Sequence, residues 1–301
     1  REEGLSFPRT SGEAEGECHM RLILTISLLA CSHAAFSAPK PEVRKPDEVV
    51  VYRKTTQAEL EIEIFRPQGW KAGDARSAVI FFFGGGWVGG STTQFHPQAT
   101  RLASLGVVAY CADYRVQSRH KTTPFEAVSD AKAAIRWIWR NAKSQGVDRD
   151  QIVAAGGSAG GHLAACCGLI SGHDDVREGE PVFIPAAMAL FNPVIDTSRK
   201  GYGYAKLKQR YRELSPVEHV HALAAPTLLQ VGSADTTTPP AGHELFKARM
   251  DKRGRNCSLF IAEGQKHGFF NPRGDNSQYW STLGRMEAFL RKEGLLKAAG
   301  N

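Results

Sequence analysis

The sequence predicts an α/β protein built on a mainly parallel β-sheet with helices on both faces. Short, nearly continuous apolar runs recur along the chain, as is typical of strands that are buried on both sides. Between several of these runs lie segments with apolar residues three and four positions apart, as in amphipathic helices. Strands that alternate with helices favour a parallel sheet covered on both faces.

The predicted strands follow one another along most of the chain. The first two, at residues 49–54 and 58–67, alternate apolar and polar residues, as half-buried strands do. The later strands are more continuously apolar and are predicted at residues 78–83, 106–115, 151–158, 186–194, 226–235 and 257–264. Helices are predicted at residues 123–143, 239–254 and 279–294.

The segment before the first strand has the layout of a secretory signal peptide. Met20 is followed by a basic residue, an apolar run at 22–30 and then small residues, with cleavage expected after Ser37 or Ala38. The run is too short to span a bilayer, so no stable membrane span is expected. Residues 1–38 are therefore interpreted as an upstream extension plus leader, 39–47 as a charged, Pro-rich linker and 48–301 as one domain.

Localisation leaves an alternative open. A cleaved leader predicts a secreted or periplasmic protein. The sequence "LLAC" also resembles a bacterial lipoprotein box, in which Cys31 would carry a lipid anchor.

Charge and cysteine content exclude some partners. The formal net charge is +7, but the basic residues are scattered and form no Lys/Arg block, which favours a solvated surface over a nucleic-acid partner. No cysteine spacing is typical of a zinc site. Buried thiols are expected, with one disulfide as the alternative, at Cys111, Cys166, Cys167 and Cys257.

A candidate nucleophile follows the strand at 151–158. Residues 156–160 read Gly-Gly-Ser-Ala-Gly and fit Gly-x-Ser-x-Gly, in which the chain turns sharply from strand into helix. The turn strains the serine backbone, and side chains at the glycine positions would clash. The strain lifts the Ser158 hydroxyl out of the sheet. The alternative is a glycine-rich turn that binds phosphate or simply packs tightly.

A serine hydroxyl needs a base, and the base needs an orienting acid. Of the ten histidines, His267 lies just past the last predicted strand and precedes a glycine, which is the expected place for the base. Asp235 ends the preceding strand and is the predicted acid, with Asp196 as its rival one strand earlier. The order Ser158, Asp235, His267 is the Ser…Asp…His order of the α/β hydrolases.

Acyl transfer also requires donors for the oxyanion of the tetrahedral intermediate. The run "FFFGGGWVGGS" at 81–91 places three bare glycines at a strand end, where backbone amides can approach a substrate. The amide of Ala159, after the nucleophile, is another donor. Trp87 and Phe269 are predicted to bind substrate and to crowd the pocket, which favours short acyl groups.

Across residues 48–295 the chain resembles the esterase/lipase branch of the α/β hydrolases. The closest groups are the hormone-sensitive-lipase-like and the acetyl-xylan and feruloyl esterase-like proteins, and the motifs that carry the resemblance are "FFFGGGWVGGS", "DYR", "GGSAGGHLAA", "VGSAD" and "KHGF". The resemblance implies an eight-stranded, mostly parallel sheet with a small cap or none. It further implies an acyl-enzyme mechanism without cofactor or metal, a Ser158, Asp235 and His267 triad, and oxyanion amides from Gly85, Gly86 and Ala159.

One residue departs from the lipase-like pattern. Phe83 stands where that pattern has the His of His-Gly-Gly-Gly, which favours the acetyl-xylan-esterase-like group. The segment 196–216 is basic and Tyr-bearing, and it is predicted to roof the site or else to form a surface connection.

The predicted function is hydrolysis of short-chain, acetyl-type esters of small molecules or polysaccharides by a serine carboxylesterase. Two alternatives remain at this stage. One is a serine peptidase of the same fold, and the other is a catalytically inactive binding protein with a hydrolase fold. The oligomeric state is left open.

Overall fold

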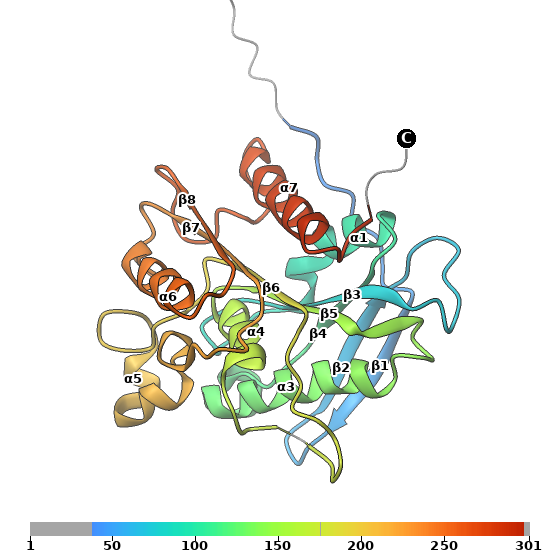
Figure 1. Ribbon diagram of the computed structural model, residues 1–301, viewed down its shortest axis with the longest axis horizontal. Helices are drawn as coiled ribbons and strands as arrows, with labels where there is room; N and C mark the ends of the chain where they lie inside the picture. The colour runs from blue at the N-terminus through green and yellow to red at the C-terminus, as the bar shows by residue number, and fades with distance from the viewer. Residues whose placement is uncertain (1–37, 175, 298–301) are drawn as a thin grey trace, which may run out of the picture. The chain divides into compact units, whose positions relative to one another are not determined.

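The computed structural model describes residues 38–174 and 176–297. An eight-stranded sheet forms the centre, with the order β1-β2-β4-β3-β5-β6-β7-β8 (Figure 1). The strands are β1 Glu48–Lys54, β2 Glu59–Phe65, β3 Arg76–Phe82, β4 Val108–Ala112, β5 Val147–Gly157, β6 Ala187–Phe191, β7 Thr227–Gly232 and β8 Cys257–Ala262. Strand β2 pairs antiparallel with β1 and β4, and the other pairs are parallel. The predicted fold class is confirmed.

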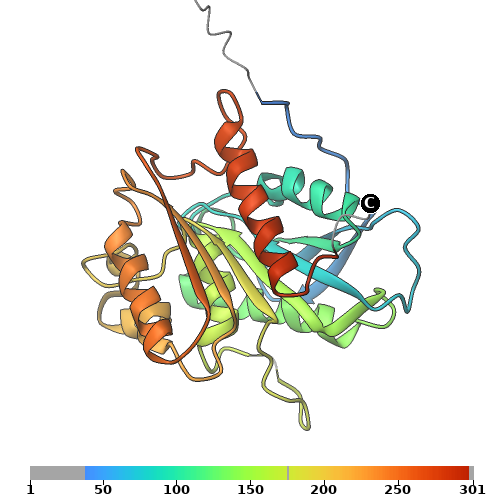
Figure 2. The same ribbon diagram turned by 45° about the horizontal axis from the view of Figure 1, so that its top comes forward.

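Helices cover both faces of the sheet. One face carries α3 (Pro124–Arg140), α4 (Ala159–Leu169) and α6 (Pro240–Lys252), and the other carries α1 (His96–Ser104) and α7 (Ser277–Lys292) (Figure 2). Strand β3 shows why its sequence is continuously apolar: Ile80 and Phe82 enter the first core, and Val79 and Phe81 enter the second. A strand buried on both faces cannot show polar alternation.

Local sequence explains the ends of the elements. Helix α3 begins with a capping box, in which the Thr123 hydroxyl accepts a hydrogen bond from the backbone of the first turn and the Glu126 carboxylate accepts from the Thr123 amide. Helix α1 was not among the predicted helices, although Pro97 lies in its first turn. Two further short helical segments, α2 (Gln117–His120) and α5 (Tyr204–Leu207), lie in the connections.

The fold places the ends of the parallel strands along one edge. Gly84, Gly85 and Gly86, called the glycine run below, follow β3. Ser158 follows β5, Asn192 follows β6, Asp235 follows β7 and His267 follows β8. Ligands of such sheets bind beyond these carboxyl ends. The topology alone therefore gathers the predicted site residues.

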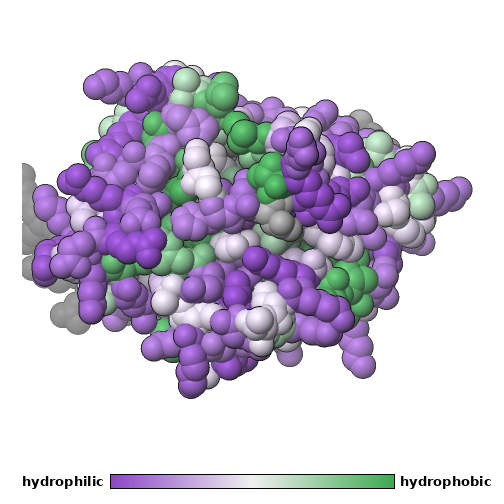
Figure 3. Space-filling model, turned by 90° about the horizontal axis from the view of Figure 1, so that it is seen from below, coloured by the Kyte–Doolittle hydropathy of each residue, from purple (hydrophilic) through white to green (hydrophobic). Residues whose placement is uncertain are grey.

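One face of the surface is mostly polar (Figure 3). The face seen in Figure 3 is largely hydrophilic, with hydrophobic residues in small separate groups. Within the described residues, no helix is long and apolar enough to cross a membrane. Residues 20–37 of the predicted leader, with Cys31, lie outside the described part of the chain. The four cysteines Cys111, Cys166, Cys167 and Cys257 are buried and unpaired.

Candidate active site

Ser158 occupies a strained turn between β5 and α4. Its φ and ψ angles are 55° and −120°, a conformation that non-glycine residues rarely adopt. Glycines surround Ser158 because neighbouring atoms leave no room for a side chain at these positions. A Cβ on Gly156 would lie 2.6 Å from the Phe82 carbonyl oxygen, and a Cβ on Gly160 would lie 2.0 Å from the same oxygen. At the intervening Gly157, a Cβ would lie 2.3 Å from the ring of Phe270. The crowding that the Gly-x-Ser-x-Gly motif predicts is present.

A hydrogen-bonded relay joins three strand ends. The Ser158 hydroxyl lies 2.9 Å from Nε2 of His267, and Nδ1 of His267 lies 2.7 Å from Oδ2 of Asp235. A carboxylate beside Nδ1 favours the tautomer with the proton on Nδ1, which leaves Nε2 free to accept from the serine. The structure thus brings together the three residues that the sequence predicted as nucleophile, base and acid.

The carboxylate of Asp235 is held in one orientation. Its Oδ1 accepts hydrogen bonds from the amides of Thr237 and Thr238 at 2.9 and 2.8 Å, and its Oδ2 accepts from the Thr238 hydroxyl at 2.9 Å. Burial alone would raise the pKa of Asp235, but the hydrogen bonds from His267 and Thr238 outweigh it and hold that pKa below its usual value. The acid is therefore ionised at neutral pH.

The rival acid, Asp196, has a different role. Its carboxylate accepts hydrogen bonds from the amide and the hydroxyl of Ser198, at 2.7 and 2.9 Å, and so closes a turn after β6. No contact between Asp196 and His267 is found among the described residues.

Asn192 is a site residue that sequence reasoning missed. It is fully buried at the end of β6 with a φ of 34°, and its Nδ2 lies 3.5 Å from Nε2 of His267. Its Oδ1 accepts a hydrogen bond from the Gly268 amide at 3.1 Å, which ties the histidine loop to β6. The signal in the sequence was its place, directly after a buried strand and before a proline.

The glycine run passes beside the nucleophile. A Cβ on Gly84 would lie 3.2 Å from the Cβ of Ser158, and a Cβ on Gly85 would lie 2.1 Å from the Gly89 carbonyl oxygen. The amides of Gly85, Gly86 and Ala159 donate no hydrogen bond to any other described residue. These three bare donors near Ser158 are the ones that the resemblance implied for the oxyanion.

Buried aromatic side chains flank the glycine run in the sequence. Phe83, which replaces the histidine of the lipase-like pattern, stacks on Tyr114 at 4.2 Å, and the Tyr114 hydroxyl donates to the Phe83 carbonyl. Trp87 and Phe269, the predicted substrate-binding residues, are only 1% and 8% exposed. Both side chains are therefore largely buried, and a direct contact with substrate stays a prediction.

The insertion at 196–216 lies against the glycine run, as the roof prediction requires. It contains α5 and a following 3-10 segment, Lys208–Leu214. Its Tyr202 ring lies 5.7 Å from that of Trp87, and a Cβ on Gly203 would lie 2.9 Å from Trp87. His162, on the nucleophile's helix, binds the insertion through a 2.7 Å hydrogen bond to the Leu214 carbonyl.

We expect the protein to lose stability in acid, because two of its histidines are buried. Burial lowers the pKa of His162, and that of His243, to about 4. The unfolded chain takes up these protons below about pH 6.5 and the folded chain does not, so the free energy of unfolding falls between about pH 6.5 and pH 4. Each histidine contributes a loss of about 3 kcal/mol over that range.

Urea unfolding at pH 7.5 and pH 4.5 measures the effect. The variant His162→Gln keeps a donor for the Leu214 carbonyl but cannot titrate, so it should lose less stability in acid than the wild type. Equal losses in the two proteins would contradict the assignment to His162. His243 lies on α6 and is 1% exposed, so it is buried as deeply as its lowered pKa requires.

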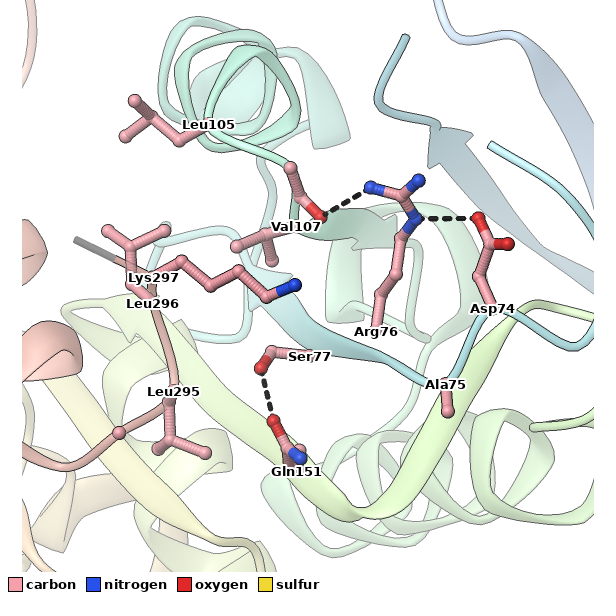
Figure 4. Close-up of a pocket in the computed structure, with 12 residues that line it drawn as sticks. Asp74, Ala75, Arg76, Ser77, Leu105, Val107, Gln151, Leu295, Leu296 and Lys297 are labelled. Carbon is pink, nitrogen blue, oxygen red and sulfur yellow. Dashed lines mark hydrogen bonds and ion pairs between the residues drawn. The ribbon is translucent and has the colours of Figure 1, made fainter. Parts of the chain in front are cut away.

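A separate cavity lies at the opposite edge of the sheet, where β3 begins (Figure 4). Two pairs of its polar side chains bind each other: Arg76 binds Asp74 at 2.7 Å, and the Ser77 hydroxyl binds Gln151 at 2.6 Å. Because Ser158 lies beyond the other ends of the strands, this cavity is not part of the site.

No cluster of His, Cys, Asp or Glu that fits a metal ion is found in residues 38–174 and 176–297.

Comparisons with known proteins agree with this geometry. The BD-FAE family model matches residues 62–198. Esterase LipC of Mycobacterium tuberculosis is 30% identical over 64% of this chain and 52% of its own length. The chain spans about half the length of the curated relatives that it matches.

Solved structures match over more of their length. Esterase Est2 of Thermogutta terrifontis, solved with propionate bound, is 43% identical over 84% of this chain and 96% of its own, with a TM-score of 0.78. The same esterase phosphorylated by paraoxon is 42% identical over the same shares, with a TM-score of 0.78. This similarity extends over nearly the whole of a solved esterase, and the chain also has the eight-stranded sheet and the strained serine turn. The chain therefore belongs to the esterase/lipase branch of the α/β-hydrolase family.

Proposed function

We propose that the protein is a serine carboxylesterase that hydrolyses short-chain, acetyl-type esters through an acyl-enzyme on Ser158. The observation that carries the proposal is the relay from Ser158 through His267 to Asp235, at 2.9 and 2.7 Å, beside three unpaired backbone amides. The relay supplies a nucleophile with its base, and the amides supply donors for the oxyanion.

The reaction proceeds in two halves. His267 removes the proton from Ser158 as the hydroxyl oxygen attacks the ester carbonyl, and Asp235 stabilises the imidazolium that forms. The amides of Gly85, Gly86 and Ala159 stabilise the negative charge on the former carbonyl oxygen. His267 then protonates the departing alcohol, and a water molecule repeats the attack on the acyl-enzyme.

The acyl group is proposed to be short because aromatic rings fill the space beneath the serine. Phe270 packs against Gly157, and Trp87 and Phe269 are buried beside the glycine run and the histidine. The related Est2 has been solved with propionate and with butyrate bound, which are short carboxylates. Both observations support a preference for acetyl to butyryl esters.

The alcohol is proposed to be a carbohydrate, and the protein to be secreted or periplasmic. The support is the resemblance to acetyl-xylan-esterase-like proteins and the leader layout of residues 20–38. An acetylated sugar or polysaccharide is the corresponding substrate class. The partially exposed insertion at 196–216 borders the site where such an alcohol would lie.

A substrate panel tests the proposal. We expect kcat/KM to be highest for p-nitrophenyl acetate, propionate or butyrate and to fall at least about 10-fold by the octanoate, since a longer chain must displace packed rings. Acetylated xylo-oligosaccharides should be deacetylated, and a feruloyl ester should be a poorer substrate. Equal rates on acetate and dodecanoate would refute the short-acyl preference. Faster cleavage of a peptide amide than of any ester would favour the peptidase alternative.

A further inference from the structure

The hydroxyl of Tyr202 lies directly over Gly86. A Cβ built on Gly86 would lie 2.6 Å from the Tyr202 hydroxyl oxygen, which is closer than real side chains approach. Gly86 has a φ of 61° and its amide donates no hydrogen bond to a described residue. The absence of a side chain at position 86 thus leaves room for a phenol that comes from a different part of the chain.

A tight turn fixes the position of Tyr202. The Tyr202 amide donates to the Asp196 carbonyl at 3.0 Å, and a Cβ on Gly201 would lie 1.9 Å from that same oxygen. The carboxylate of Asp196 holds Ser198, so the turn is closed from both sides. The Tyr202 ring is tilted by 31° over the indole of Trp87. The phenol is therefore held over the glycine run by backbone and ring contacts and does not depend on its own hydroxyl.

The hydroxyl has no hydrogen-bond partner among the described residues, although the side chain is half-buried. By contrast, the hydroxyl of Tyr114 donates to the Phe83 carbonyl at 2.8 Å. A phenol can donate one hydrogen bond. At Gly86, an unpaired side-chain donor and an unpaired backbone donor thus adjoin the same part of the site.

We propose that Tyr202 is a catalytic residue whose hydroxyl donates a hydrogen bond to the ester oxygen that becomes negatively charged during acyl transfer. The inference rests on the proposed function, because it assigns the oxygen bound over Gly86 to an ester. No proton is transferred in this role: the phenol stays protonated and acts together with the backbone amides. The insertion at 196–216 would then contribute a catalytic group in addition to covering the site.

The variant Tyr202→Phe tests the role of the hydroxyl. A buried oxyanion donor is typically worth about 10²–10³ in turnover. The phenol is only half-buried, so we expect Tyr202→Phe to lower kcat about 10- to 100-fold, while KM changes less than about threefold. The matched control is Tyr204→Phe on the same insertion, whose ring contacts Arg199 and Tyr211 and which lies outside the relay. Its kcat should stay within about twofold of the wild type.

A second measurement separates a catalytic role from a structural one. Phosphorylation by paraoxon also builds negative charge on an oxygen held by the oxyanion donors, so its rate should fall in Tyr202→Phe by a factor similar to that for kcat. The thermal midpoint should stay unchanged, because the hydroxyl has no protein partner to lose. Tyr202→Ala, which removes the ring as well, should lose at least as much kcat as Tyr202→Phe.

The outcomes distinguish this inference from the proposed function. A wild-type protein without esterase activity would remove the proposed function itself. An active wild type with a Tyr202→Phe variant whose kcat and paraoxon rate are normal would overturn only the role of Tyr202. A raised KM at unchanged kcat would also overturn it, because the hydroxyl would then bind the ground state and the transition state equally.

Discussion

Substitution Ser158→Ala should reduce the turnover of p-nitrophenyl acetate by about 10⁶-fold, the loss typical of a triad serine. The variant keeps the glycine run and the His267–Asp235 pair but has no oxygen to form the acyl-enzyme. The backbone strain at position 158 remains, so the fold should be retained. Initial-rate assays at substrate concentrations up to saturation measure the effect.

A matched serine elsewhere provides the control. Ser144 is exposed, and its hydroxyl donates to the Asn141 carbonyl near the end of α3. Ser144→Ala should hydrolyse the ester at the wild-type rate. Turnover of Ser158→Ala within about 100-fold of the wild type would mean that another group is the nucleophile, since the remaining donors alone do not account for so much activity.

Substitution Asp235→Asn should lower kcat by about 10⁴-fold while the site geometry persists. The reason lies in the hydrogen bonds around the carboxylate. Oδ1 accepts from the Thr237 and Thr238 amides, so the oxygen of an asparagine must take that place and its NH₂ group must face His267. Nδ1 of the imidazole then becomes an acceptor and Nε2 carries the proton. In that tautomer Nε2 cannot remove the proton from Ser158.

The rival carboxylate gives the comparison for this prediction. Asp196→Asn should retain activity within a few-fold, because the asparagine oxygen can still accept from the Ser198 amide. A large loss in Asp196→Asn together with a small one in Asp235→Asn would reverse the assignment of the acid. The two variants can be compared in one assay with the same ester.

The site residues that sequence predicts well are those whose signals are local. A side chain at either motif glycine, Gly156 or Gly160, would meet the Phe82 carbonyl oxygen, so the Gly-x-Ser-x-Gly pattern directly records the crowding around Ser158. Position at a strand end also identified Asp235 and His267, because all parallel strands of one sheet end at the same edge. The family fold follows from the same alternation of strands and helices.

Other residues could not be identified, because their environment depends on contacts distant in sequence. Asn192 reaches His267 across 75 residues, and Tyr202 reaches Gly86 only through the fold of the insertion. For Trp87, the local sequence did not indicate how deeply the ring is buried. Its aromatic ring beside a glycine run favoured a substrate contact, whereas packing against His162 and Tyr202 leaves it 1% exposed. The sequence pattern does not show which side of the run such a ring occupies.

Helix α1 illustrates the same limit in the fold. Its apolar residues Ala99, Leu102 and Ala103 follow a helical period, but they come after glycine-rich and polar residues that do not mark a clear start. The helix is stabilised by packing onto the face of the sheet that it shares with α7. Tertiary packing commonly decides helices of this length.

Covalent labelling tests the account most directly. The central claim is that the Ser158 hydroxyl, activated by His267, attacks an electrophilic ester. Treatment with paraoxon followed by peptide mass spectrometry should show one diethyl phosphate on the peptide that contains Ser158, with loss of esterase activity in parallel, and no adduct in Ser158→Ala. An adduct on a different residue, or a folded wild-type protein that stays unlabelled, would contradict it.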